Sequence, residues 1–201
     1  MTVRERTDRH ESTRRLQAEA VRLRIVEDSP EAEATVDKAS FFAIMGAFPT
    51  GVTVVTALDD NGEPRGLTSN AISSVSAEPP LVLVCVDKRS NTLPALRHSR
   101  RFVVNFLSNG RGDLSNLFAS KAADKFADVA WRPAGNGMPW LHVDSLAHAE
   151  CTTEQEIDAG DHVILIGRVT GGQPPSPGTQ PLMYFRRTYG TWQEPDGFTR
   201  G

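Results

Sequence analysis

The sequence predicts a mainly β protein organised as an antiparallel barrel, with a few short helices. Short runs rich in β-branched residues recur from residue 40 onward, and turn signals separate them. The helical patterns between these runs are short and few, which disfavours the repeated βαβ units of a doubly wound parallel sheet. The expected class therefore rests on pattern alone, before any motif is considered.

The first predicted strand, residues 51–57, reads GVTVVTA and precedes the hairpin turn Asp60-Asn61-Gly62. Residues 66–75 continue as a polar strand or strand-loop, and Pro79-Pro80 introduces a buried strand at 81–86. Apolar or alternating runs predict the remaining strands at 101–107, 146–157, 162–170 and 182–185.

Helices are expected at three places: 40–47, 92–98 with Ser90 as a possible N-cap, and 114–120 after Asp113. Residues 171–180, GGQPPSPGTQ, are a predicted Pro/Gly loop.

The chain is divided into a charged N-terminal arm (1–38), a main domain (39–193) and a short tail (194–201). In the arm, Leu16, Ala20 and Leu23 fall at helical spacing, which allows a short amphipathic helix. The arm is interpreted either as a segment that packs on a second subunit or a partner, or as a solvated, partly disordered leader.

The composition is that of an ordinary soluble globular protein, with 201 residues, 39% hydrophobic and 23% charged. A net charge of -3 argues against nucleic-acid binding. The longest apolar run, near 81–86, is too short for a bilayer span, which needs about 20 residues. The charged N-terminus lacks the apolar core of a secretory signal, so a cytoplasmic location and no membrane partner are expected.

The two cysteines, Cys85 and Cys151, lie in separate apolar runs and are expected to be buried thiols, with a disulfide as the less favoured alternative. The five histidines lack the spacing of a metal site, so no metal is expected. The sequence has no phosphate-binding GxxxxGK loop, no GxSxG elbow and no HExxH motif. Gly135-Asn136-Gly137 is interpreted as a turn, because Pro139 follows it.

Three polar segments are candidates for a site. Thr68-Ser69-Asn70, with Ser73 and Ser74, forms a hydroxyl and amide run that must contact water, its own members or a polar ligand; a solvated edge strand is the plain alternative. Residues 88–92 (KRSNT) could hold a phosphate at a helix start, or could simply cap that helix. In Gly160-Asp161-His162, the histidine at the strand start is either a site residue or a surface residue.

Together these segments resemble the flavin reductase family, the reductase components of two-component flavin monooxygenases. The resemblance runs from about Phe41 to Trp192 and includes FPTGVTVVTA (48–57), GLTSNAISSVSAEPPLVLVCV (66–86), KRSNT (88–92) and GDHVILIGRV (160–169). It implies a split β-barrel that dimerises, with flavin in a groove near the subunit interface. Ala71 and Ile72 depart from the family pattern, which often has Ser and Phe there.

The resemblance also implies site residues. Those implied for the flavin, with its phosphate at 90–92, are Thr50, Gly51, Val52, Thr68, Ser69, Asn70, Ser73, Ser74, Ser90, Asn91, Thr92, Lys125 and Phe126. Those implied for the nicotinamide coenzyme are His162, Tyr184, Arg186, Arg187 and Tyr189. No residue is required as an acid or base, and His162 is expected to position the nicotinamide.

The implied function is that of an NAD(P)H:flavin oxidoreductase. It would transfer a hydride from NADH, or alternatively NADPH, to FAD or FMN and supply reduced flavin, by diffusion, to a partner monooxygenase. Two other functions stay open: a non-catalytic flavin-binding or electron-transfer module, and an oxidase of the pyridoxamine-phosphate type on a similar barrel.

Overall fold

The computed structural model describes residues 35–192, so the helix expected around Leu16 and the tail 194–201 lie outside the described residues. Contacts divide the chain into two units, Met1–Phe41 and Phe42–Gly201, and each is considered by itself. The described part of the second unit contains the strands and the candidate site.

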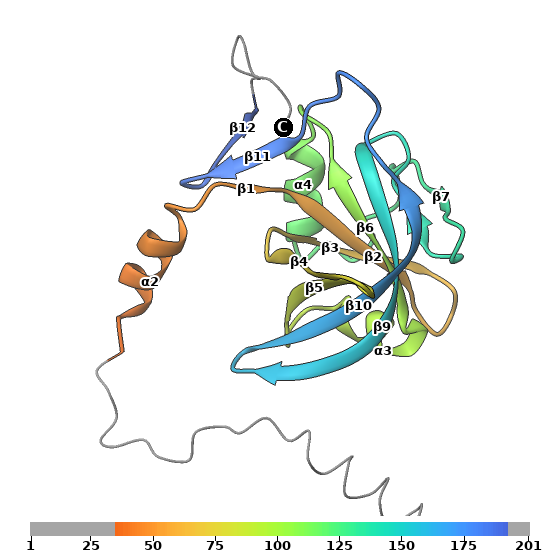
Figure 1. Cartoon of the computed structure of the whole chain (residues 1–201), viewed down its shortest axis with the longest axis horizontal. Coiled ribbons are helices and arrows are strands. Elements are labelled where there is room, and N and C mark those ends of the chain that lie inside the picture. The colour runs from red at the N-terminus through yellow and green to blue at the C-terminus, as the bar shows by residue number, and fades with distance from the viewer. Residues whose placement is uncertain (1–34, 193–201) are drawn as a thin grey trace, which may run out of the picture. The chain divides into compact units, whose positions relative to one another are not determined.

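A seven-stranded antiparallel sheet dominates the second unit (Figure 1). Its strands are β2 (Thr53–Leu58), β3 (Pro64–Ser69), β4 (Ile72–Ala77), β5 (Pro80–Asp87), β6 (Arg101–Leu107), β9 (Ser145–Ala159) and β10 (His162–Gln173). They lie in the order β3-β2-β6-β9-β10-β5-β4. The edge strands β3 and β4 are consecutive in the chain but pair with β2 and β5, not with each other. This open seam makes the fold a split barrel, and the predicted mainly β class is confirmed.

Most predicted strands are confirmed, and one predicted run is divided between two strands. The run 66–75 was predicted as a polar strand or strand-loop; β3 ends at Ser69 and β4 begins at Ile72, so the run contains a corner between two strands. The hairpin of β9 and β10 is longer than predicted and takes in residues 171–173 of the expected loop. Gly160 lies at its turn with a φ of +65°, a conformation that favours glycine.

Two small sheets accompany the main one. The first contains β1 (Thr50–Gly51), β11 (Leu182–Phe185) and β12 (Thr188–Thr191), and the second contains β7 (Arg132–Pro133) and β8 (Pro139–Trp140). The sequence missed β12 and the two-residue strands β7 and β8. Arg186 and Arg187 join β11 to β12 with φ values of 47° and 62°, as a two-residue turn of the primed type requires.

The described helices are α2 (Lys38–Met45), α3 (Leu93–Ser99) and α4 (Gly112–Ala119), each close to its predicted position. The carboxylate of Asp37 accepts hydrogen bonds from the backbone of Ser40 (3.0 Å) and Ala39 (2.8 Å), which starts α2 and lowers the pKa of Asp37. Thr92, not Ser90, occupies the N-cap position of α3. Between residues 35 and 192, no helix is both long and apolar enough to cross a membrane.

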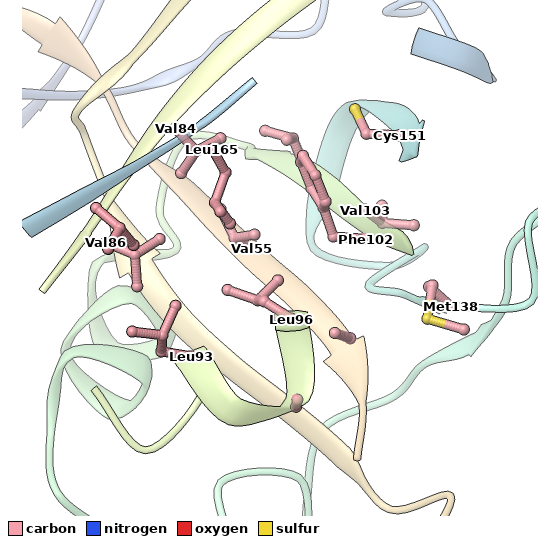
Figure 2. Packing of buried hydrophobic residues seen from close by; sticks show 14 residues of the cluster. Val55, Val84, Val86, Leu93, Leu96, Phe102, Val103, Met138, Cys151 and Leu165 are labelled. Carbon is pink, nitrogen blue, oxygen red and sulfur yellow. The ribbon is translucent and has the colours of Figure 1, made fainter. Parts of the chain in front are cut away.

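The main core is filled by the residues whose apolar pattern marks the strands (Figure 2). Val55 and Phe102 are fully buried, and Leu96 of α3 packs into the same cluster at 1% exposure. A Cβ atom on Gly167 would lie 2.6 Å from the Phe102 ring, so glycine is needed there to let β10 approach that ring. This rigid sheet holds the strand ends from which the candidate site is built.

Candidate functional site

A cleft of about 390 Å³ lies where several segment ends meet, namely the ends of β3 and β5, the turn before α3, the end of α4 and the start of β10. Its lining residues are Leu67, Thr68, Ser69, Asn70, Ala71, Cys85, Asp87, Arg89, Ser90, Asn91, Phe118, Ala119, Ser120, Lys121, Lys125 and His162. The cleft therefore gathers segments that are up to about ninety residues apart in sequence.

One wall of the cleft is neutral and polar. Thr68 donates its hydroxyl to the carbonyl of Ser115 at 2.6 Å, which orients that side chain toward α4. The Ser69 hydroxyl accepts a hydrogen bond from the backbone of Ala71 at 3.2 Å, and Ser69 is 7% exposed. Asn70 is exposed and donates its amide to the hydroxyl of Thr50 at 3.2 Å, which links the cleft to β1. These groups suit a ligand with hydrogen-bonding ring edges and little charge.

Cationic side chains in the same lining supply charge. The Lys125 ammonium donates to the carbonyls of Phe118 (2.7 Å) and Gly66 (3.3 Å), and partial burial lowers its pKa. An ammonium has three N–H donors, so one donor remains for an anionic ligand group. Lys121 is exposed on the same lining.

Arg89 is fixed by a two-pronged pair with Asp87. Its Nη2 lies 2.7 Å from Oδ2 and its Nε lies 3.1 Å from Oδ1 of Asp87. This hydrogen bonding raises the pKa of Arg89 and holds the pKa of Asp87 far below its usual range. Because planar pairs of this kind restrict the guanidinium, the charge of Arg89 stays at the cleft.

His162 stands at the start of β10. Its Nδ1 lies 2.7 Å from Oδ1 of Asp161, and the hydrogen bond with His162 lowers the pKa of that carboxyl. An ionised carboxylate can only accept, so the shared proton belongs to Nδ1 and Nε2 is left for a ligand. The ring is 42% exposed, which keeps it accessible from the cleft.

A second cleft of about 280 Å³ adjoins the first. Its lining residues are Pro64, Arg65, Gly66, Asn91, Thr92, Ala122, Ala123, Lys125 and Phe126. The two clefts share Asn91 and Lys125. A ligand too long for the first cleft can therefore extend past the Lys125 amine into the second cleft.

A comparison with protein families shows which family this chain belongs to. The family model described as "Flavin reductase like domain" matches residues 45–193, which is most of the chain and includes every cleft-lining residue. This chain belongs to the flavin reductase-like family.

Individual relatives agree with this assignment. A flavin reductase (NADH) of Kitasatospora aureofaciens is 48% identical over 162 residues, covering 80% of this chain and 85% of the relative. The reductase subunit HsaB of a flavin-dependent monooxygenase from Mycobacterium tuberculosis is 38% identical and covers 83% and 88%. A flavin reductase (NADPH) of Lentzea aerocolonigenes is 37% identical and covers 85% and 97%.

A solved structure is similar over nearly the same region. The NADH:FAD oxidoreductase SgcE6 of Streptomyces globisporus, in complex with NAD and FAD fragments, matches with a TM-score of 0.74 and 33% identity. The match covers 83% of this chain and all of that chain. The predicted flavin reductase fold is thereby confirmed.

The predicted site residues of this flavin reductase-like chain divide into groups. Those that line the first cleft together are Thr68, Ser69, Asn70, Ser90, Asn91, Lys125 and His162. Thr92 and Phe126 line only the second cleft. Thr50 and Gly51 lie in β1, where Thr50 is bonded to Asn70, whereas Val52 is 4% exposed in the core. Ser73 and Ser74 are exposed on β4, outside the cleft lining.

The residues predicted for the coenzyme are split as well. Only His162 lines the cleft, while Tyr184, Arg186, Arg187 and Tyr189 belong to the β11–β12 hairpin. The Tyr189 hydroxyl lies 2.9 Å from both Ser115 Oγ and Asn116 Oδ1, which anchors the hairpin on α4. Within one chain, the hairpin residues are therefore outside the cleft lining.

The predicted site did not include three polar lining residues, Asp87, Ser120 and Lys121, and it included Arg89 only as part of the segment 88–92. Arg89 lies inside the KRSNT segment, and Lys121 directly follows the NLFAS segment at 116–120. The charged residues in and beside these segments were the sequence signal that could have identified them as part of the site. The other finding concerns thiols: Cys151 is buried and its pKa is raised to about 12, but Cys85 is only partly buried and lines the cleft.

The lining fits a flavin by its chemistry. Hydroxyl and amide groups at 68–70 suit the polar edges of an isoalloxazine ring, and Leu67, Ala71 and Phe118 offer apolar surface for its faces. Lys125, Lys121 and Arg89 suit a phosphate. Across residues 35–192, no group of three or more His, Cys, Asp or Glu side chains is arranged to hold a metal ion.

Proposed function

We propose that this chain is an NAD(P)H-dependent flavin reductase, with NADH as the preferred coenzyme and FAD or FMN as the flavin. One observation carries the proposal: in a chain of the flavin reductase-like family, the polar end of β3, the Lys125 amine and His162 line one cleft. A binding surface for a flavin and a side chain suited to orient a second ligand are therefore adjacent.

The flavin-binding role is assigned to two sides of this cleft. Thr68, Ser69 and Asn70 would hold the polar ring edges, because their hydroxyl and amide groups are supported by bonds to Ser115, Ala71 and Thr50. The turn at 90–92, with the free donor of Lys125, would hold the phosphate. Supported side chains of this kind lose less entropy when a ligand binds.

Hydride transfer from nicotinamide to flavin is chemistry that the two bound ligands supply themselves. The protein needs no nucleophile, acid or base for it, and must instead align the reacting atoms to within about 3–3.5 Å. His162 serves that alignment. Asp161 fixes the ring through Nδ1, so Nε2 is left to hydrogen-bond a polar group of the coenzyme.

The proposal includes a homodimer and a partner oxygenase. Ile44, Met45 and Phe48 are 61%, 51% and 67% exposed, an unusual amount of large apolar surface in five consecutive residues. A second copy would cover such side chains. Reduced flavin would then leave by diffusion to a flavin-dependent monooxygenase.

We further infer that residues 39–193 form the catalytic domain, with the arm 1–38 and the tail 194–201 outside it, and that the protein acts in the cytoplasm. These inferences rest on the position of the cleft and the family match within 45–193 and on the sequence composition. Size-exclusion chromatography with light scattering, on the full chain and on a chain starting at residue 39, tests both the dimer and the boundary.

The function is tested by mixing the purified protein with NADH or NADPH and a catalytic amount of FAD or FMN. Oxidation of the coenzyme is followed at its absorbance band in air, for all four pairs. Flavin-dependent oxidation well above the protein-free rate is expected, fastest with NADH. If no pair exceeds the protein-free rate while flavin still binds, the chain is a flavin-binding or electron-transfer module instead.

A further inference from the structure

The two turns that border the cleft are joined by a residue outside the cleft lining. Lys88 follows the last residue of β5, and its side chain points to the β9–β10 turn, where Nζ donates to the carbonyl of Gly160 and to Oδ1 of Asp158, both at 2.7 Å. Its backbone N–H also donates to the carbonyl of Asp161 at 3.0 Å. Lys88 thus makes three bonds to the four residues that precede His162.

The neighbours of Lys88 face the other way. Asp87 and Arg89 line the cleft, and Ser90 and Asn91 follow them into the proposed phosphate turn. In the sheet, Asp87 is the register partner of His162 across β5 and β10. One residue on the outside of the cleft therefore connects the strand end that leads to the phosphate turn with the strand start that carries His162.

The ion pair between Lys88 and Asp158 contributes little to the stability of the fold. The Lys88 side chain is 37% exposed and that of Asp158 is 78% exposed, and exposed ion pairs contribute little to folding. The hydrogen bond to Gly160 differs from this ion pair, because it holds a backbone carbonyl in the β9–β10 turn, where glycine has no side chain to hold the turn itself. By holding this carbonyl, Lys88 restricts the position of Asp161 and of the His162 ring that is hydrogen-bonded to Asp161.

We propose that Lys88 is a positioning residue that sets the place of His162 relative to the flavin phosphate turn, and so couples coenzyme binding to flavin binding. This inference rests on the proposed reductase function. Lys88 touches neither ligand and acts through the 158–161 turn.

The test variant is Lys88→Met, which removes both side-chain bonds and keeps the aliphatic stem. Its matched control is Arg97→Met, which removes another exposed ion pair to β9, with Glu156, and keeps the hydrogen bonds of Lys88 to the 158–161 turn. For Lys88→Met we expect the KM for NADH to rise about fivefold with kcat within about twofold of wild type, because the coenzyme is oriented less well. Arg97→Met should leave both constants within about twofold.

A readout without catalysis accompanies the kinetics. In the ¹⁵N-labelled, flavin-free protein, the ring nitrogens of His162, assigned with His162→Gln, should shift in Lys88→Met and not in Arg97→Met. Lys88→Arg, which retains a cation and donors, should recover at least half of both effects. Asp158→Asn, which weakens the same contact from its exposed end, should show the same direction with a smaller size and serves if Lys88→Met does not fold.

Equal behaviour of Lys88→Met and Arg97→Met, in KM and in the His162 signals, would overturn the inference. A wild-type protein that oxidises no coenzyme would overturn the proposed function instead. In that case the ring signals alone decide whether Lys88 positions His162, with a shift in Lys88→Met supporting it and an unchanged spectrum refuting it.

Discussion

Two regions predicted to contact the nicotinamide coenzyme differ in whether they line the cleft. His162 stands on the rim of the cleft, next to the polar end of β3 and the turn at 90–92. The β11–β12 hairpin, in contrast, is turned onto α4 by the Tyr189 hydroxyl, and its rings of Tyr184 and Tyr189 pack on each other with centroids 5.3 Å apart. One region lines the cleft, and the other is hydrogen-bonded to α4 of its own chain.

Of the residues that the family resemblance implies for the coenzyme, only His162 lines the cleft within one chain. Arg186 and Arg187 adopt the left-handed conformation at the hairpin tip, which costs energy for residues other than glycine. Phe185, beside them, is 41% exposed and lies under the Arg186 guanidinium at 5.0 Å. A tip with strained cations and an exposed ring suits contact with a second copy, whose cleft it could complete.

The largest expected effect is at His162. We predict that His162→Ala raises the KM for the coenzyme about tenfold, which corresponds to about 1.4 kcal/mol, and lowers kcat by less than about threefold. The reason is that the imidazole orients the coenzyme and transfers no proton. Steady-state kinetics at saturating flavin give both constants. A large loss of kcat at unchanged KM would contradict this role.

Complementation between two variants tests whether the β11–β12 hairpin acts on the neighbouring copy. The double variant Arg186→Ala, Arg187→Ala should raise the coenzyme KM about threefold, since exposed cations contribute modestly to binding. If the hairpin acts on the neighbouring copy, mixing this variant with His162→Ala creates one intact site per mixed dimer. Random exchange makes about half of the dimers mixed, so their intact sites alone give about a quarter of the wild-type activity at low coenzyme. The variant homodimers raise the total to roughly 0.35 of wild type, whereas the average of the two separate variants is roughly 0.2.

The control for complementation is each variant mixed with itself under the same exchange conditions. Activity of the mixture no greater than the average of the two separate variants would show that the hairpin does not complete the neighbour's cleft.

Strand pattern carried most of the fold prediction. Runs such as 101–107 and 182–185 were predicted with their observed bounds, because each is a short, mostly apolar run of strand length. The corner at Asn70 and Ala71 could not be predicted, since it arises from pairing: β3 pairs with β2, but β4 pairs with β5. Two-residue strands such as β7 are too short to leave any periodic signal.

The same corner limits the prediction of the site. Thr68-Ser69-Asn70 and Ser73-Ser74 are chemically alike, and only the turn between β3 and β4 puts the first group on the cleft lining and the second outside it. Arg89 was predicted only as a member of the segment 88–92. Its pair with Asp87 could not be predicted, because such a contact between a strand end and a turn has no spacing rule in sequence.

An effect smaller than that of His162→Ala distinguishes the two flavins through the second cleft. If the part of FAD beyond its first phosphate enters this cleft past Lys125, Ala123→Trp fills the path. We predict a rise in the KM for FAD of about fivefold and a rise for FMN of less than about twofold, because a large side chain excludes only the longer ligand. Equal changes for both flavins would place the adenylate elsewhere.

The smallest effect concerns the two thiols and compares the cleft with the core. Burial raises the pKa of both Cys85 and Cys151, the latter to about 12, so both are protonated at pH 8 and react slowly with iodoacetamide. Cys85 should react first, because it lines the cleft, and saturating FMN should slow it about threefold by covering it. Peptide mass spectrometry over time measures both rates, and labelling of Cys85 that ignores FMN would remove it from the flavin site.

The size of the pH dependence separates these thiols further, because its sign is the same for both. A thiol whose pKa is raised on folding stabilises the native state below the unfolded value of 9.0, and this contribution is lost as the pH rises toward the folded value. For Cys151 the loss therefore extends from pH 9.0 to about 12. Cys151→Ala should flatten the fall in unfolding free energy across that window, whereas Cys85→Ala should alter it less, because Cys85 is less buried. Urea titrations at pH 8 and pH 10 measure the difference, and an equal slope in the two variants would show that the core thiol does not set the alkaline limit.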